Sequence, residues 1–275
     1  MSELLDRFEA FLEAGYSSKN TKRAYIRDVD EFLKQGFPFT LDGLNMYMKY
    51  LFDRGIKPSS ISRKLASLSI FFDFLKERGV VEKNYVKLLD KPRVKRSLPK
   101  FLDLDETVVL LESVENKRDR AILELLYSSS LRASELVGLD VKDVDFEHNR
   151  VRVRRKGGRS VYVPFSERAG RFLKEYVKDR RDGALFLNRY GKRLSTRSLQ
   201  KIVKKYSMMS IFKDISPHTL RHTKATHLLN SGMDIRMLQR FLGHSTIKAT
   251  QIYTHVNLKQ LSEIYDRAHP LAKDE

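Results

Sequence analysis

The sequence predicts a mainly α-helical protein of two domains, with one small β-sheet in the second domain. Three observations lead to this prediction. Apolar residues recur at helical spacing through most of the 275 residues. A basic segment with two prolines, 91–100, interrupts that pattern. Apolar and polar residues alternate strictly on both sides of Gly157-Gly158, which is typical of a β-hairpin.

Residues 1–90 are predicted to form a four-helix bundle. Short turns separate the helices. Each helix begins at a polar residue suited to capping its N-terminus: Ser2, Ser18 or Asn20, Thr40 and Ser59. Each helix carries an apolar stripe, so the four stripes are expected to form one core. The polar faces carry the basic side chains predicted to contact a polyanion: Lys19, Lys22, Arg23, Arg63 and Lys64.

Residues 91–100 are predicted to be an extended linker, because Pro92 and Pro99 resist helix formation. The segment has five basic side chains and no acidic one. An extended basic chain suits a phosphate backbone, and three of its side chains are predicted contacts: Arg93, Lys95 and Arg96.

Residues 101–275 are predicted to form the second domain. Two helices are expected at about 105–114 and 117–130, followed by a short one that contains Arg132. The hairpin comes next, with Val151 and Val163 on its apolar face. Further helices are expected near the following ranges: 195–208, 217–231, 234–242, 245–255 and 257–268.

The charge balance indicates a nucleic acid partner. Lysine and arginine number 53 against 35 aspartate and glutamate, which gives a net charge of +18. There is no cysteine, so disulfides and thiolate metal sites are excluded. The first residues have no apolar run like that of a signal peptide, and no apolar stretch reaches the roughly 20 residues that span a bilayer. We therefore expect a cytoplasmic protein without a membrane partner.

The chemistry of the chain is concentrated near residue 220. His218 and Arg221 are separated by three positions, so they share one face of a helix and can grip a phosphate diester together. Tyr253 follows as a candidate nucleophile that would form a phosphotyrosyl ester. Without a metal, cations must stabilise the transition state, and Arg132, in an otherwise apolar stretch, is the candidate for a second arginine.

A metal site is the alternative that the histidine spacing offers. His218 and His222 are four apart, which matches one zinc-ligand spacing. However, Thr219 stands where an HExxH motif has glutamate, and the segment 215–233 contains no carboxylate. The sequence therefore predicts no metal and no cofactor.

Taken together, these motifs resemble the tyrosine recombinase (phage integrase) family, and its Xer-type members most simply. The resemblance covers nearly the whole chain and rests on segments in the family's order: Leu131-Arg132-Ala133-Ser134-Glu135-Leu136, His218-Thr219-Leu220-Arg221-His222, Leu242-Gly243-His244 and Tyr253. It implies a helical, SAM-like core-binding domain at 1–90 and a catalytic domain at 101–275.

The resemblance also implies a role for each site residue. Arg132 and Arg221 would clamp the scissile phosphate, and Tyr253 would be the nucleophile. His218 would act as general base or acid, and His244 would bind phosphate. Lys156 matches the hairpin lysine that protonates the leaving 5′-oxygen.

The hairpin turn departs from the family pattern. The family's turn usually has glycine on both sides of the lysine, whereas Arg155 precedes Lys156 here and Gly157-Gly158 follows it. Arg159 is therefore expected either to share the role of Lys156 or to bind a neighbouring phosphate.

The partner implied is double-stranded DNA with a short specific recombination site. Two synapsed sites would be bound by a homotetramer, and the protein without DNA would be a monomer or dimer. A C-terminal helix at about 257–268 would dock on a neighbouring subunit or on its own domain. The alternatives are a DNA-binding protein without catalysis, a mobile-element integrase and a type IB topoisomerase. An intact residue set favours an enzyme over a mere binder.

Overall fold

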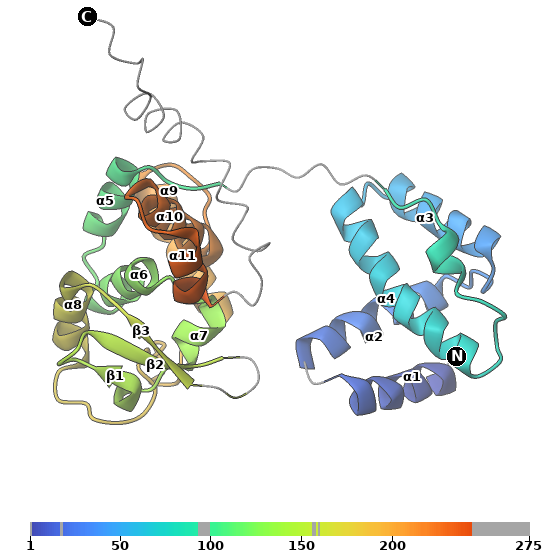
Figure 1. Cartoon of the computed structure of the whole chain (residues 1–275), viewed down its shortest axis with the longest axis horizontal. Helices are drawn as coiled ribbons and strands as arrows, with labels where there is room; N and C mark the ends of the chain where they lie inside the picture. Colours follow the sequence, from blue (N-terminus) through green and yellow to red (C-terminus); the bar gives the residue numbers. More distant parts are fainter. Residues whose placement is uncertain (1, 17–18, 93–99, 156–157, 159, 244–275) are drawn as a thin grey trace, which may run out of the picture. The chain divides into compact units, whose positions relative to one another are not determined.

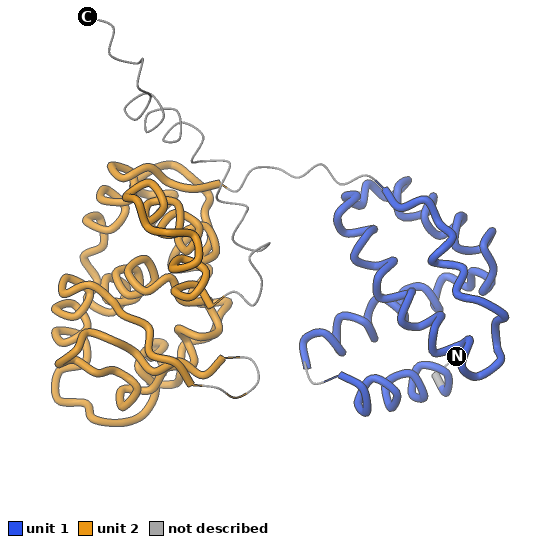
Figure 2. Tube along the Cα trace, viewed as in Figure 1, with its two compact units in different colours: residues 1–97 blue, residues 98–275 orange. Residues whose placement is uncertain are grey.

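The structure is a computed structural model that describes residues 2–16, 19–92, 100–155, 158 and 160–243. The chain divides into two compact units, Met1–Ser97 and Leu98–Glu275 (Figure 2). Each unit has its own apolar core. The expected mainly helical fold with one small sheet is confirmed.

Unit 1 is entirely helical over its described residues (Figure 1). Its elements are α1 (Ser2–Gly15), α2 (Lys19–Lys34), α3 (Leu41–Asp53), α4 (Pro58–Glu77) and the 3-10 helix η1 (Tyr85–Leu88). Thr40 caps α3 as expected, since its hydroxyl accepts from the amide of Gly43 at 3.1 Å. The fourth helix begins one residue before the predicted Ser59, because Pro58 suits the first helical turn.

An aromatic cluster fills the core of unit 1. Phe8, Phe71 and Phe74 contact one another, with ring centroids between 5.1 and 6.1 Å apart. Phe32 and Tyr47 form a second edge-to-face pair at 5.0 Å. All five rings are fully buried, so the apolar stripes of the sequence form a single core, as predicted.

Unit 2 contains helices on and around a small sheet. Its helices are α5 (Leu104–Glu112), α6 (Lys117–Ser129), α7 (Ala133–Gly138), the 3-10 helix η2 (Val141–Asp143), α8 (Glu167–Val177), α9 (Thr196–Ser210), α10 (Pro217–Asn230) and α11 (Ile235–Leu242). The buried helix α6 packs against both α8 and α10. The helices expected at 245–255 and 257–268 lie outside the described residues.

The sheet is antiparallel, in the order β1 (Val144–Asp145), β2 (Arg150–Arg154) and β3 (Ser160–Pro164). The predicted hairpin pairs Val151 with Val163, and both side chains are buried. The sequence analysis did not predict β1, which has only two residues.

Helix α8 was also missed, although the sequence carries its signals. Ser166 caps the helix by accepting from the amide of Ala169. Ala169, Leu173 and Val177 lie on one face and are buried against α6. Within the described parts of both units, no helix is long and apolar enough to cross a bilayer.

Candidate active site

Three of the six predicted catalytic residues meet in one pocket of unit 2. This pocket has a volume of about 620 Å³, and a second pocket of about 390 Å³ shares Ser134 with it. Segments from the α6–α7 junction, α9 and α10 line the first pocket: Leu131, Arg132, Ala133, Ser134, Thr196, Gln200, Ser216, Pro217, His218 and Arg221. Arg132 and Arg221 are thus neighbours in space although 89 positions separate them in the sequence.

Helix α10 places His218 and Arg221 on the same face. Ser216 caps the helix by accepting from the amide of Thr219 at 3.2 Å, and Pro217 occupies the first helical position. Leu220 is fully buried in the unit's core. Because that residue fixes the rotation of the helix, His218 and Arg221 both line the pocket, one turn apart.

Arg221 is fixed by backbone carbonyls. Its guanidinium donates through Nη1 to the carbonyl of Ser130 at 2.5 Å and through Nη2 to the carbonyl of Leu242 at 2.6 Å. The residue is only 3% exposed. Such a guanidinium is preorganised, because two carbonyls 112 positions apart in the chain determine its orientation before any ligand binds.

Arg132 lies between α6 and α7, so the prediction that a short helix contains it is wrong. Ser130 ends α6 in the left-handed region, with φ of 52°, and Arg132 is the residue before α7. Glu135 holds Arg132 twice. Its carboxylate accepts from the Arg132 amide and from Nη1, both at 2.8 Å. Glu135 therefore holds both the backbone and the guanidinium of Arg132 in place beside the pocket.

The C-terminal end of α11 gathers three arginines. Three consecutive carbonyls each accept from a different guanidinium: Phe241 from Arg155 at 3.2 Å, Leu242 from Arg221 at 2.6 Å and Gly243 from Arg132 at 3.5 Å. The last carbonyls of a helix carry partial negative charge, which attracts cations. Arg155 was not among the predicted site residues, and its only signal in the sequence is that it stands where the family's turn usually has glycine.

The imidazole of His218 lies between cations and a second histidine. Its Nε2 is 2.8 Å from Nε2 of His222, so one ring donates and the other accepts. Burial lowers the pKa of His218 below its usual value of 6.5, and the positive charges of Arg221 and Arg132 lower it further. His218 is therefore neutral at pH 7 and can accept a proton.

His227, on the same helix, is a structural residue. Its Nδ1 is 2.9 Å from the Tyr127 hydroxyl, and its Nε2 is 3.0 Å from the carbonyl of Leu102. The amide of Leu102 in turn donates to Thr223 Oγ1 at 3.0 Å. These bonds fasten the first described residues of unit 2 to α10.

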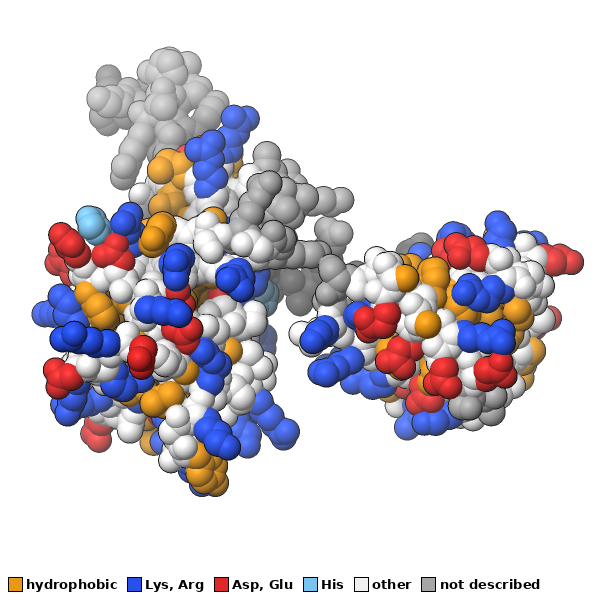
Figure 3. Space-filling view, turned by 90° about the horizontal axis from the view of Figure 1, so that it is seen from below, with side chains coloured by type: hydrophobic (Ala, Val, Ile, Leu, Met, Phe, Trp, Pro, Cys, Tyr) orange, Lys and Arg blue, Asp and Glu red, His pale blue; other side chains and the backbone are white. Residues whose placement is uncertain are grey.

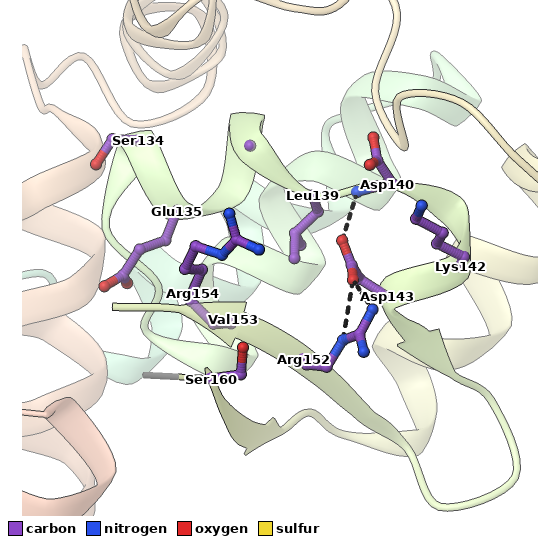
Figure 4. Close-up of a pocket in the computed structure, with 11 residues that line it drawn as sticks. Ser134, Glu135, Leu139, Asp140, Lys142, Asp143, Arg152, Val153, Arg154 and Ser160 are labelled. Atoms are coloured by element: carbon purple, nitrogen blue, oxygen red, sulfur yellow. Dashed lines mark hydrogen bonds and ion pairs between the residues drawn. The ribbon is translucent and has the colours of Figure 1, made fainter. Parts of the chain in front are cut away.

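The second pocket, about 390 Å³, lies beside α7 and has several charged groups in its lining (Figure 4). Arg152 and Arg154 reach into it from β2, and Glu135 lies at its α7 end. Arg152 is paired with Asp143 at 3.0 Å. Arg154 therefore lines the pocket beside α7, whereas the next residue, Arg155, contacts the end of α11.

Several predicted site residues lie outside the described residues: Lys156, Arg159, His244, Tyr253, Arg93, Lys95 and Arg96. In the described part of the chain, no three histidine, aspartate or glutamate side chains form a group that could hold a metal.

The predicted DNA-contact residues of unit 1 differ in their surroundings. Lys19 and Arg23 are exposed. The Lys22 and Lys64 side chains are each only 10% exposed and are paired with Glu13 and Glu31 respectively. Arg63 is 45% exposed at its side chain and paired with Asp28.

Comparison with known proteins gives matches over both units. Residues 100–260 match the phage integrase family, and residues 5–79 match the phage integrase N-terminal SAM-like domain. The tyrosine recombinase XerC of Thermodesulfovibrio yellowstonii is 38% identical, over 96% of this chain and 94% of the relative. That of Pelobacter propionicus is 40% identical, over 99% of this chain and 98% of the relative.

Two solved structures illustrate the similarity in three dimensions. The XerA recombinase is 27% identical, with a TM-score of 0.58 over 98% of this chain and 99% of that chain. A lambda integrase dimer bound to a COC′ core site is 17% identical, with a TM-score of 0.76 over 100% of this chain and 80% of that chain. The second comparison bears on the fold alone.

Proposed function

The chain belongs to the phage integrase family of tyrosine recombinases, and we propose that it cleaves and rejoins DNA at a specific site through a 3′-phosphotyrosyl bond to Tyr253. The observation that carries the proposal is the pocket in which Arg132, His218 and Arg221 converge. Two guanidiniums and a neutral imidazole suit one phosphate diester, since the guanidiniums bind its non-bridging oxygens and the imidazole accepts a proton.

The reaction conserves the phosphodiester bond energy. The Tyr253 oxygen attacks phosphorus and gives up its proton to His218. The bond from phosphorus to the 5′-oxygen breaks, that oxygen keeps the electron pair, and Lys156 supplies it with a proton. The 5′-hydroxyl of the partner strand then attacks the phosphotyrosine and releases the tyrosine, so no nucleotide is consumed.

Positive charge replaces a metal in this scheme. The transition state carries added negative charge on the non-bridging oxygens, and the residues proposed to stabilise it are Arg132, Arg221 and His244. Arg221 is already fixed by two carbonyls, so little reorganisation is needed when that charge develops. Arg132 is 44% exposed at its side chain and can turn to the phosphate while Glu135 retains it.

We propose an Xer-type role, in which the enzyme resolves chromosome dimers in the cytoplasm. The relatives named tyrosine recombinase XerC, matched over nearly their full length, favour this role over integration of a mobile element. Two synapsed copies of a short site would be bound by four protomers, with the segment at about 257–268 linking them. The net charge of +18 and the relatives named tyrosine recombinase support double-stranded DNA as the partner.

The DNA surface of unit 1 is proposed to have two layers. Lys19, Arg23 and Arg63 reach the phosphates directly, since their side chains are exposed or half exposed. Lys22 and Lys64 lie beneath this layer, where their pairs with Glu13 and Glu31 hold the helices together. In unit 2, Lys and Arg side chains are spread over the face shown in Figure 3, with acidic side chains among them.

Covalent capture on a nicked duplex tests the proposed function. A nick beside the cleavage position makes the released fragment, which carries the freed 5′-hydroxyl, short enough to diffuse away. The protein then stays attached to the DNA through a bond that survives denaturation. We expect this adduct to form in EDTA without nucleotide, and mass spectrometry to find the DNA remnant on Tyr253. A Tyr253→Phe chain is the negative control. Strict dependence on magnesium, or attachment at another residue, would contradict the mechanism.

The lowered pKa of His218 predicts the pH dependence of adduct formation. The neutral imidazole is the proton acceptor, so the rate should fall only as pH drops through a value below 6.5. Single-turnover rates between pH 5 and 8 measure this. His218→Gln should be slower and should lack the acid limb. An acid limb centred above pH 6.5 would exclude His218 as the base.

A further inference from the structure

Arg155 makes an unusual contact at the end of β2. The residue is half-buried, and it follows the strand directly, at the beginning of the hairpin turn. Its Nη2 donates to the carbonyl of Phe241 at 3.2 Å. The guanidinium also lies against Gly243, where a Cβ atom would come within 1.6 Å of Nη1 and 2.0 Å of Cζ. Only glycine at position 243 leaves room for this contact.

The contact requires desolvation of a positive charge. Burial lowers the pKa of Arg155 below its usual value; Glu135 opposes this shift and Arg132 adds to it. Nε of Arg155 is buried and has no hydrogen-bond partner among the described residues. An arginine without such contacts would keep its guanidinium in water. The hydrogen bond to the carbonyl at the helix end and the packing on Gly243 therefore offset the desolvation of Arg155.

The two ends of the contact precede two proposed catalytic groups in the sequence. Arg155 comes directly before Lys156, and Gly243 comes directly before His244. Gly158 follows in the same turn with a φ of 78°, a left-handed conformation that favours glycine. The Arg155 contact therefore fixes the backbone immediately before Lys156 in the sequence.

We propose that Arg155 is a positioning residue that attaches the base of the β2–β3 turn to the C-terminal end of α11 and thereby places Lys156 for proton delivery to the leaving oxygen. This inference rests on the proposed function. It assigns a purpose to the arginine that replaces glycine in the turn. It also explains why Arg155 turns towards α11 while Arg154 lines the pocket beside α7.

The experiment compares two nicked substrates that differ in one atom. In the first, the leaving group at the cleavage position is the ordinary 5′-oxygen. In the second, sulfur replaces that bridging oxygen, so the P–S bond breaks and a thiolate leaves with the electron pair. A thiolate is a far weaker base than an alkoxide and leaves without a proton. Loss of a proton donor therefore slows the first substrate and spares the second.

Arg155→Met and Arg155→Ala are the test variants. Methionine keeps an apolar stem against Gly243 but has no donor and no charge, which guards against a folding defect in the alanine variant. We expect adduct formation on the oxygen substrate to slow at least about 10-fold, and the rate on the sulfur substrate to stay within about 3-fold of wild type. Arg155→Lys, which keeps the charge, should recover part of the loss.

Two control variants show what loss of the proton donor and loss of a nearby charge each do to the two rates. Lys156→Ala should be slow on oxygen and restored on sulfur. Arg154→Ala removes a neighbouring charge from the same strand and should alter both substrates by the same factor. The inference is overturned if the Arg155 variants lose equal rate on both substrates, or keep the wild-type rate on oxygen. If Lys156→Ala is not restored by sulfur, the proposed role of Lys156 fails, and the inference about Arg155 fails with it.

Discussion

Replacing Arg221 with alanine should slow covalent adduct formation by about 10³-fold. The guanidinium is buried at 3% exposure and oriented by the carbonyls of Ser130 and Leu242. Its removal takes a preorganised positive charge away from the phosphate. Single-turnover cleavage of the nicked substrate, with DNA binding measured separately, gives the rate of the chemical step.

The same change should lower stability, so the two effects must be separated. Each buried carbonyl left without its donor costs about 1–3 kcal/mol. Thr223→Val offers a matched control on the same helix, because it leaves the Leu102 amide without its acceptor at a similar cost. We expect Thr223→Val to melt earlier yet cleave DNA at close to the wild-type rate. If Arg221→Ala cleaved within 10-fold of wild type, its proposed role in catalysis would be wrong.

Arg221→Lys refines this result. Lysine keeps the charge, but a single ammonium lacks the planar fork that reaches two carbonyls in different directions. We expect the lysine variant to bind DNA like wild type and to remain slow in cleavage. Equal activity of lysine and arginine here would mean that charge alone, without orientation, is sufficient.

Replacing Asp28 with alanine should destabilise unit 1 by about 3–5 kcal/mol. The carboxylate is 0% exposed and accepts from Arg63 Nη2 at 3.0 Å and from Ser67 Oγ at 2.7 Å, with Lys64 Nζ 3.6 Å away. Without it, the positive charge of Lys64 stays in the helix interface with only Glu31 to balance it. Thermal melting with hydrogen exchange over 19–92 measures the loss.

The pKa of Asp28 gives the pH range of this contribution. Burial by itself would raise the pKa, but hydrogen bonds from Arg63 and Ser67 and the charges of Arg63 and Lys64 outweigh it. The folded-state pKa therefore lies below 3.8, and the stabilisation is present at neutral pH and is lost as acid protonates Asp28 below that value.

Asp30→Asn is the matched control for Asp28→Ala. Asp30 lies two positions along on α2 and pairs with Lys34 on the helix surface at 2.7 Å. Surface pairs of this kind contribute about 0.3–0.5 kcal/mol, so the control should melt within a degree or two of wild type. Equal destabilisation by both variants would show that Asp28 is not a special contact between α2 and α4.

The local structure was largely predictable from the sequence. Apolar spacing identified the four helices of unit 1, and Thr40 and Ser216 cap their helices as the sequence suggests. The alternation at Val151 and Val163 identified the hairpin, because side chains alternate along a strand. Helix α8 was missed although Leu173 and Val177 have the same kind of spacing.

The candidate site was predictable only in part. The sequence spacing places His218 and Arg221 on one helical face, because residues three apart are neighbours on a helix. It gives no reason why Arg132 should join them. That meeting depends on the turn at Ser130, whose left-handed backbone ends α6 two residues before Arg132.

By itself, the sequence determined most of the helices, the hairpin and the family of this protein, because these depend on residue types at short, fixed spacings. The tertiary structure decided which charges distant in the sequence meet. The sequence places Lys64 on the polar face of its helix. In the structure it is buried and paired with Asp28 and Glu31, more than 30 positions away in the chain. Arg155 likewise reaches Phe241 across 86 positions. Such contacts depend on how packed helices cross and how far a side chain extends, and neither is encoded in local spacing.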